Sequence, residues 1–156
     1  MSIVSDIEKL KKEKNAVILA HYYVDDDVQD VADYIGDSFY LSKVATKVSQ
    51  DRIIFAGVEF MGESAKILNP EKRVFMPDIN ADCPMAHMAD KDEILKLREQ
   101  YDDLAVVCYI NSTAELKKYS DVCVTSSNAV KIVKNLPNKN IFFIPDRNLG
   151  HFVAKQ

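Results

Sequence analysis

Polar side chains that can exchange hydrogen bonds follow several short apolar runs of this 156-residue chain. After three of these runs come His21, Tyr22 and Tyr23, then Tyr109, Asn111 and Ser112, then Ser126, Ser127 and Asn128. Imidazole, phenol, amide and hydroxyl groups all form hydrogen bonds with ligand oxygens. Because ligands of open parallel sheets bind beyond the carboxyl ends of the strands, these residues predict a crevice for a small oxygen-rich molecule.

The apolar runs themselves predict a parallel sheet. Each is short and unbroken, as expected of strands buried on both faces, and helical patterns separate them. The predicted strands are 16–22, 52–57, 73–77, 104–110, 121–125 and 140–145. Strands that alternate with helices indicate right-handed βαβ units and an α/β fold. After the first strand, the spacing of Val28, Val31, Ala32 and Ile35 predicts a helix capped by Gly36.

The chain also repeats itself. Residues 75–78 (FMPD) and 143–146 (FIPD) lie 68 positions apart (143 − 75), and the same offset aligns 54–56 with 122–124. Upstream the offset becomes 88, which places His21 on Tyr109 (109 − 21). We therefore predict two pseudo-repeated three-stranded parallel-sheet α/β/α units, residues 1–88 and 89–156, packed closely without a linker.

The three cysteines differ in their surroundings. Cys108 and Cys123 lie inside apolar strands, which predicts that both are small core residues. Cys83 stands in a polar loop beyond a strand end, where it is either an ordinary loop thiol or a functional one. Cys83 and His87 have the spacing of half a zinc site, but the sequence shows no matching second pair of ligands.

Composition and charge exclude several classes of protein. The chain is 47% hydrophobic and 28% charged, as in soluble globular proteins, and its net charge of −4 argues against a general nucleic-acid binder. No apolar run reaches the ~20 residues of a membrane span, and the glycines form no dinucleotide-binding or phosphate-binding loop. The opening segment lacks the apolar region of a signal peptide, so we expect a cytoplasmic protein with reduced thiols.

An ordered set of motifs resembles the quinolinate synthase family over nearly the whole chain. The motifs are AHYY (20–23), GDS (36–38), FMGESAK (60–66), PD (77–78) with DCPM (82–85), YINS (109–112), TSSN (125–128) and PDRNLG (145–150). Each is weak alone, and their shared order makes the resemblance specific.

The resemblance implies a condensing enzyme of NAD biosynthesis. Such an enzyme joins iminoaspartate to dihydroxyacetone phosphate, giving quinolinate with release of phosphate and water. A four-iron, four-sulfur cluster held by three cysteines leaves one iron open to act as a Lewis acid. The family fold has three similar α/β units around a pseudo-threefold axis with the site at their junction, and the two units predicted here correspond to two of them.

The resemblance also implies roles for particular residues. The first cluster cysteine falls on Cys83, and the substrate-binding positions fall on His21, Ser38, Tyr109, Asn111 and Ser126. His21, Tyr23 and Tyr109 fall at catalytic positions, with Tyr23 matching a tyrosine of the condensation chemistry, where a phenol can transfer a proton.

The chain departs from the family pattern in its extent. The second and third cluster cysteines and the third unit have no counterpart among residues 1–156, so activity of this chain alone is in doubt. The alternative is a catalytically inert α/β fragment that binds a dicarboxylate or phosphate. The surface that a third unit would cover is exposed when that unit is absent, and such a surface would favour self-association.

Overall fold

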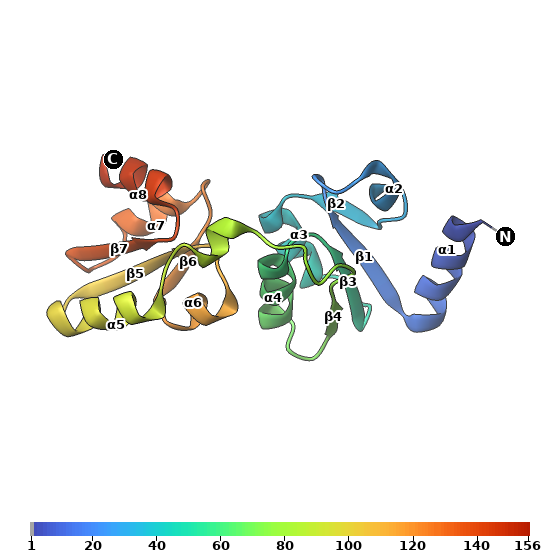
Figure 1. The fold of residues 1–156 in the computed structure, drawn as a ribbon, viewed down its shortest axis with the longest axis horizontal. Helices are drawn as coiled ribbons and strands as arrows, with labels where there is room; N and C mark the ends of the chain where they lie inside the picture. Colours follow the sequence, from blue (N-terminus) through green and yellow to red (C-terminus); the bar gives the residue numbers. More distant parts are fainter. Residues whose placement is uncertain (1) are drawn as a thin grey trace. The chain divides into compact units, whose positions relative to one another are not determined.

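The structure, a computed structural model that describes residues 2–156, contains two compact α/β units (Figure 1). The first extends to Asp82 and the second runs from Cys83 to Gln156, whereas the predicted boundary lies between residues 88 and 89. The short 3-10 helix η1 (Pro84–His87) therefore belongs to the second unit. Within residues 2–156, no helix has the length and hydropathy needed to cross a bilayer.

The first unit is built around a parallel sheet of four strands in the order β2-β1-β3-β4. Its elements are α1 (Ile3–Lys14), β1 (Ala16–His21), α2 (Asp26–Gln29), β2 (Tyr34–Gly36), α3 (Ser38–Ala45), β3 (Arg52–Ala56), α4 (Glu59–Leu68) and β4 (Arg73–Phe75). β1 lies inside the sheet, and its four middle residues are buried on both faces. This burial is why its sequence is an unbroken apolar run.

The second unit has a parallel sheet of three strands in the order β6-β5-β7. Its further elements are α5 (Lys91–Gln100), β5 (Leu104–Tyr109), α6 (Ala114–Lys118), β6 (Val122–Val124), α7 (Ala129–Lys134), β7 (Asn140–Ile144) and α8 (Arg147–Ala154). Val106 and Cys108 of β5 pack with α5 and α6 on one face of the sheet. Val107 packs with α7 and α8 on the other face, so β5 is also buried on both sides.

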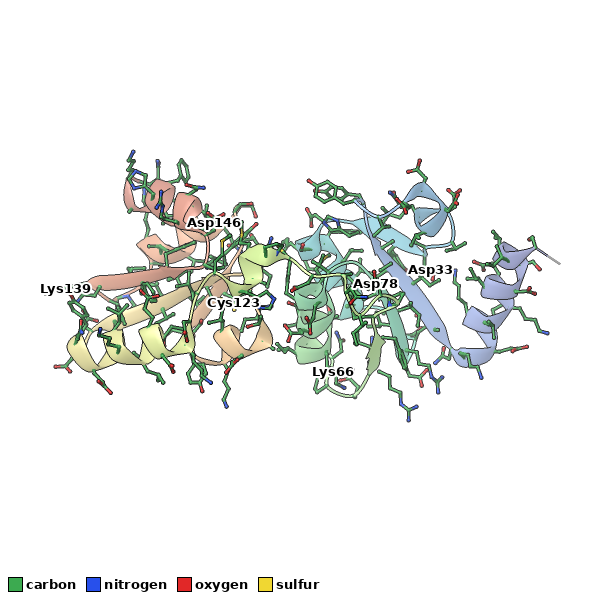
Figure 2. The ribbon with its side chains drawn as sticks, viewed as in Figure 1. Asp33, Lys66, Asp78, Cys123, Lys139 and Asp146 are labelled. Atoms are coloured by element: carbon green, nitrogen blue, oxygen red, sulfur yellow. The ribbon has the colours of Figure 1, made fainter. Side chains whose placement is uncertain are left out.

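The α/β fold and all six predicted strands are confirmed, but the predicted helix from Val28 to Gly36 is wrong. A helix occupies only Asp26–Gln29, and the chain then turns into the edge strand β2. Asp33 forms the turn: its backbone N–H donates to Ile18 O at 2.9 Å, and its carboxylate accepts from Ile18 N at 2.8 Å (Figure 2 labels Asp33). These two bonds to β1 compete with helix formation and start a strand instead.

One constant offset relates the two units, which corrects the predicted repeat. In the first sheet β1 pairs Leu19 with Tyr34 and Ala16 with Arg52; in the second β5 pairs Val107 with Val122 and Leu104 with Asn140. Each residue number rises by 88 (107 − 19, 122 − 34, 104 − 16, 140 − 52). The equivalent strands are therefore β1 and β5, β2 and β6, and β3 and β7. The offset of 68, which aligned β3 with β6, is wrong because it left β2 out.

The turn before the edge strand is also repeated. Asp121 is the equivalent of Asp33 (121 − 33 = 88), and its carboxylate accepts a hydrogen bond from Val106 N at 2.7 Å. Its own N–H donates to Val106 O at 2.9 Å. A basic side chain completes each turn: Lys11 lies 2.9 Å from Asp33, and Arg98 lies 2.9 Å from Asp121.

We expect Asp121→Ala to lower the free energy of unfolding by about 1–3 kcal/mol, because the buried N–H of Val106 loses its acceptor. The lost ion pair with Arg98 is half-exposed and adds less. Urea denaturation monitored by circular dichroism measures this change. Asp102→Ala, a substitution at an exposed aspartate of the same unit, is the matched control. Equal stability of the two variants would contradict this role of Asp121.

Candidate functional site

An aromatic cluster follows β1 in the first unit. The rings of His21 and Tyr22 stack with centroids 4.6 Å apart, and the Tyr23 ring meets that of His21 edge-on at 4.7 Å. The backbone N–H of Tyr23 donates to Nδ1 of His21 at 3.2 Å. A neutral imidazole whose Nδ1 accepts a hydrogen bond carries its proton on Nε2, so His21 offers an Nε2–H donor to a ligand. Tyr23 is 82% exposed, so it can reach a ligand in solvent.

Ser38 lies close to His21 because of strand pairing. His21 is directly paired with Gly36 of β2, and the next two residues, Asp37 and Ser38, begin α3. The Asp37 carboxylate caps this helix by accepting from Tyr40 N at 2.7 Å. The backbone N–H groups at the start of a helix and its dipole favour a negatively charged ligand.

Burial lowers the pKa of His21 below its ordinary value of 6.5, and the nearby Asp37 carboxylate opposes part of this shift. Desolvation disfavours the imidazolium, whereas an opposite charge stabilises it. The net lowering keeps His21 neutral at pH 7. A neutral imidazole can donate one hydrogen bond and exchange a proton with a bound substrate.

We call the residues at the end of the central strand and just after its edge strand in each unit a corner: His21 with Ser38 in the first unit, and Tyr109 with Ser126 in the second. The corner of the second unit follows β5. The N–H of Ile110 donates to Val124 O at 2.9 Å, which keeps the chain paired with β6 past the end of the strand. The buried Ser112 hydroxyl then donates to Tyr109 O at 2.8 Å and turns the chain toward α6. This turn holds Tyr109 and Asn111 half-buried at the carboxyl end of the sheet.

Burial also raises the pKa of Tyr109 above its ordinary value of 10.0, and electrostatic interactions with Asp146 and Cys83 add to the shift. Both neighbours belong to the second unit: Asp146 caps α8, and Cys83 precedes η1. Figure 2 shows Asp146 beyond the end of β7. Tyr109 is therefore a neutral phenol at pH 7, and Cys83 lies within electrostatic reach of it.

Ser126 lies in the turn that joins β6 to α7. The N–H of Thr125 donates to Oδ1 of Asn128 at 2.7 Å, and the hydroxyls of Thr125 and Ser127 are 2.9 Å apart. These bonds hold the turn closed while Ser126 remains exposed. Its hydroxyl is therefore available to a ligand.

The offset of 88 relates the candidate residues in pairs. Tyr109 is the equivalent of His21, Asn111 of Tyr23, and Ser126 of Ser38 (109 − 21, 111 − 23, 126 − 38). Each unit thus presents one residue at the end of its central strand, one two positions later and one just after its edge strand. The third residue begins α3 in the first unit and lies in the turn before α7 in the second. Only the first two pairs follow from the predicted repeat; the pairing of Ser38 with Ser126 requires β2.

Metal ligands are not gathered within either unit. Among residues 2–156, no three side chains of histidine, cysteine, aspartate or glutamate lie close enough to hold one ion. Cys83 is half-buried and Cys108 is fully buried. The prediction that Cys123 is a core residue is wrong: it is exposed, because β6 forms the edge of the sheet.

Two aspartates contribute to the electrostatics of these corners, and sequence reasoning assigned neither of them a role. Asp37 acts on His21 and Asp146 acts on Tyr109. Both are helix caps that follow strands next to the central one. An aspartate just after an apolar run and before a helical pattern is the sequence signal that could have pointed to them.

We expect Asp37→Asn to lower the pKa of His21 further, because the substitution removes the carboxylate charge that stabilises the imidazolium. Asparagine still provides the cap oxygen for Tyr40 N, so α3 should be preserved. An NMR titration of the imidazole protons measures the pKa in both proteins. The signals of His151, on α8 of the other unit, give a second imidazole for comparison in the same spectra. A pKa of His21 that rises or stays constant would refute the assigned influence of Asp37.

Comparison with known proteins identifies the family. The family model for quinolinate synthetase A protein matches residues 5–156. The chain is 67% identical over 150 residues to a quinolinate synthase of Fusobacterium nucleatum, covering 96% of this chain and 50% of the relative. It is 56% identical over 154 residues to one of Caldicellulosiruptor saccharolyticus, covering 99% and 51%. It is 54% identical over 156 residues to one of Clostridium perfringens, covering 100% and 52%. The chain thus spans about half the length of these curated relatives, and it belongs to the quinolinate synthase family.

Proposed function

We propose that these residues form part of a quinolinate synthase that condenses iminoaspartate with dihydroxyacetone phosphate in NAD biosynthesis. The observation that carries the proposal is the repeated pair of corners, His21 with Ser38 and Tyr109 with Ser126, in a member of this family. Each corner combines a ring at the end of a buried strand with a hydroxyl that closely follows the neighbouring edge strand. Both substrates are anions rich in oxygen, and such groups suit them.

In this proposal the neutral rings act as hydrogen-bond donors to substrate oxygens. At pH 7 both rings are neutral, because the pKa of His21 is lowered and the pKa of Tyr109 is raised. The neutral imidazole keeps its Nε2–H and the neutral phenol keeps its O–H, so each can donate one hydrogen bond. Asn111 can donate and accept through its amide, which orients a carboxylate or carbonyl. The hydroxyls of Ser38 and Ser126 add further donors. Ser38 begins α3, where the positive end of the helix dipole favours anions, and Ser126 lies in the exposed turn before α7.

The condensation also needs proton transfers, which we assign to His21, Tyr23 and Tyr109. The neutral imidazole of His21 presents its Nε2–H to the substrate, where it can stabilise an oxyanion that forms as a proton is transferred. Tyr23 is exposed and its ring contacts that of His21, so the two can exchange protons with the same substrate atom or with solvent.

Cys83 would provide one ligand of a four-iron, four-sulfur cluster. A half-buried thiol in the loop before η1, beside Tyr109, suits one thiolate of a three-cysteine set. The residues of this chain do not form the whole set, because Cys108 lies inside the sheet and the cysteines do not cluster with other ligands in residues 2–156. When bound, the cluster would act as a Lewis acid on a substrate oxygen.

Two further expectations remain proposals. We place the protein in the cytoplasm, where its substrates would be made, and we expect the chain to self-associate when the rest of a synthase is absent. Sedimentation velocity of the 156-residue chain tests the second point. A monomer at all concentrations would contradict it.

We expect His21→Ala and Tyr109→Phe each to lower kcat by about 100-fold or more in a full-length synthase that contains these residues, because each removes a group that contacts the reacting substrate. Far-UV circular dichroism should show the fold unchanged. His151→Ala and Tyr101→Phe, at positions outside both corners, are the matched controls and should retain activity. Turnover near that of the unmodified enzyme in either site variant would remove that residue from the site.

Iron content tests the role of Cys83 independently of activity. After anaerobic reconstitution of the full-length synthase, Cys83→Ser should lose most of its bound iron and the visible absorption of the cluster. Cys123→Ser, at an exposed thiol of the same unit, should retain both. Full iron loading of the Cys83 variant would show that Cys83 is not a ligand.

A further inference from the structure

The two strand cysteines of the second unit face each other. Cys108 of β5 and Cys123 of β6 are direct partners in the parallel pairing. Directly paired residues of neighbouring strands place their side chains on the same face of the sheet, with strands about 4.7–4.9 Å apart. A disulfide requires Cα atoms about 4.4–6.8 Å apart. The strand pairing therefore places the Cα atoms of these two cysteines, both free thiols in this structure, within the separation that a disulfide requires.

The pair is accessible from one side. Cys108 has 0% of its surface exposed, but Cys123 is exposed on the edge strand β6, which pairs with β5 alone in the three-stranded sheet (Figure 2 labels Cys123). An oxidant in solvent can thus reach Cys123 first, and the oxidised Cys123 can then react with Cys108. An edge strand of three residues can also shift more easily than an inner strand when a new bond forms.

The surroundings favour a thiolate. The pKa of Cys108 is lowered to about 6, chiefly by a hydrogen bond from the Cys123 thiol and also by the charge of Lys117, while burial opposes the shift. The hydrogen bond with Cys108, together with partial desolvation on the side that faces the sheet, raises the pKa of Cys123. Of the two sulfurs, Cys108 is therefore the one that ionises first, while Cys123 keeps its proton. Thiolates, not thiols, react with oxidants.

We propose that Cys108 and Cys123 form a reversible intramolecular disulfide in response to hydroperoxides. The proposal concerns the second unit alone and does not depend on the proposed synthase activity. Neither cysteine belongs to the candidate site, although Cys108 directly precedes Tyr109 and Cys123 lies three positions before Ser126 (126 − 123). The bond would tie together the ends of the two strands that carry these residues.

The oxidation proceeds in two displacements. The buried Cys108 thiolate takes the proton of the Cys123 thiol as the Cys123 sulfur attacks one oxygen of hydrogen peroxide. The O–O bond breaks and hydroxide departs, which leaves Cys123 as a sulfenic acid. Cys108, having given its proton to that hydroxide, then attacks the Cys123 sulfur and breaks its S–O bond. The hydroxide released from the S–O bond takes a proton from solvent. One thiol, one thiolate, one peroxide and one solvent proton thus yield one disulfide and two waters. Glutathione reverses the reaction by thiol–disulfide exchange.

The test is peptide mapping of the 156-residue chain after treatment with stoichiometric hydrogen peroxide. Remaining thiols are alkylated in denaturant, and trypsin then cleaves after Lys117 and Lys118, which separates Cys108 from Cys123. We expect two alkylation sites per chain to be lost together and a cross-linked pair of peptides to appear. Reduced glutathione should restore both sites, whereas Cys83 should remain alkylated throughout.

Two variants distinguish this pair from general thiol oxidation. Cys83→Ser should form the same cross-linked peptides, and Cys123→Ser should leave Cys108 fully alkylated after peroxide treatment. Circular dichroism checks that the variants keep the fold, which the exposed position of Cys123 favours. Unchanged alkylation of Cys108 and Cys123 in the treated chain would overturn the proposal. So would bonds formed only with Cys83 or only between chains.

Discussion

Each sheet depends on an aspartate that ties an edge strand to the central strand beside it. The carboxylates of Asp33 and Asp121 accept hydrogen bonds from Ile18 N and Val106 N at 2.8 and 2.7 Å. A backbone N–H inside an apolar core must find an acceptor, so the bond sets where the edge strand begins. That starting point sets the register of β2 on β1 and of β6 on β5. The register then decides which residues lie side by side at the carboxyl ends of the strands.

The constant register has a direct chemical consequence. Because β2 pairs in step with β1, Ser38 begins its helix next to His21, and the equivalent pairing brings Ser126 next to Tyr109. The two corners share the same backbone arrangement and differ in the ring at the end of the central strand, which is His21 in the first unit and Tyr109 in the second. Burial affects the rings in opposite directions, since it disfavours the charged form of each: the pKa of His21 falls and that of Tyr109 rises. Both rings are therefore neutral donors at pH 7.

The same pairing explains the cysteines. Cys108 lies on the buried central strand and Cys123 lies at the same level on the edge strand, so one thiol is enclosed and its partner is open to solvent. The strand Val122–Val124 consists of apolar residues, as a buried strand would. It nevertheless lies at the edge of the sheet, where it has a neighbouring strand on one side only. Residue type alone does not distinguish these two environments.

The sequence by itself determined the α/β class, the six apolar strands, the family and the candidate residues, because buried parallel strands require unbroken apolar runs and their polar ends follow directly along the chain. It did not reveal β2 (Tyr34–Gly36), because the spacing of the apolar residues from Val28 to Ile35 also suits a helix. The tertiary structure decided that segment through Asp33, which bonds to a residue fifteen positions earlier (33 − 18). It likewise decided the constant repeat, the pairing of Ser38 with Ser126 and the exposure of Cys123. Each of these features depends on which strands become neighbours. Hydrogen bonds and packing between segments distant in the chain decide that pairing, and the local periodicity of a sequence contains no information about it.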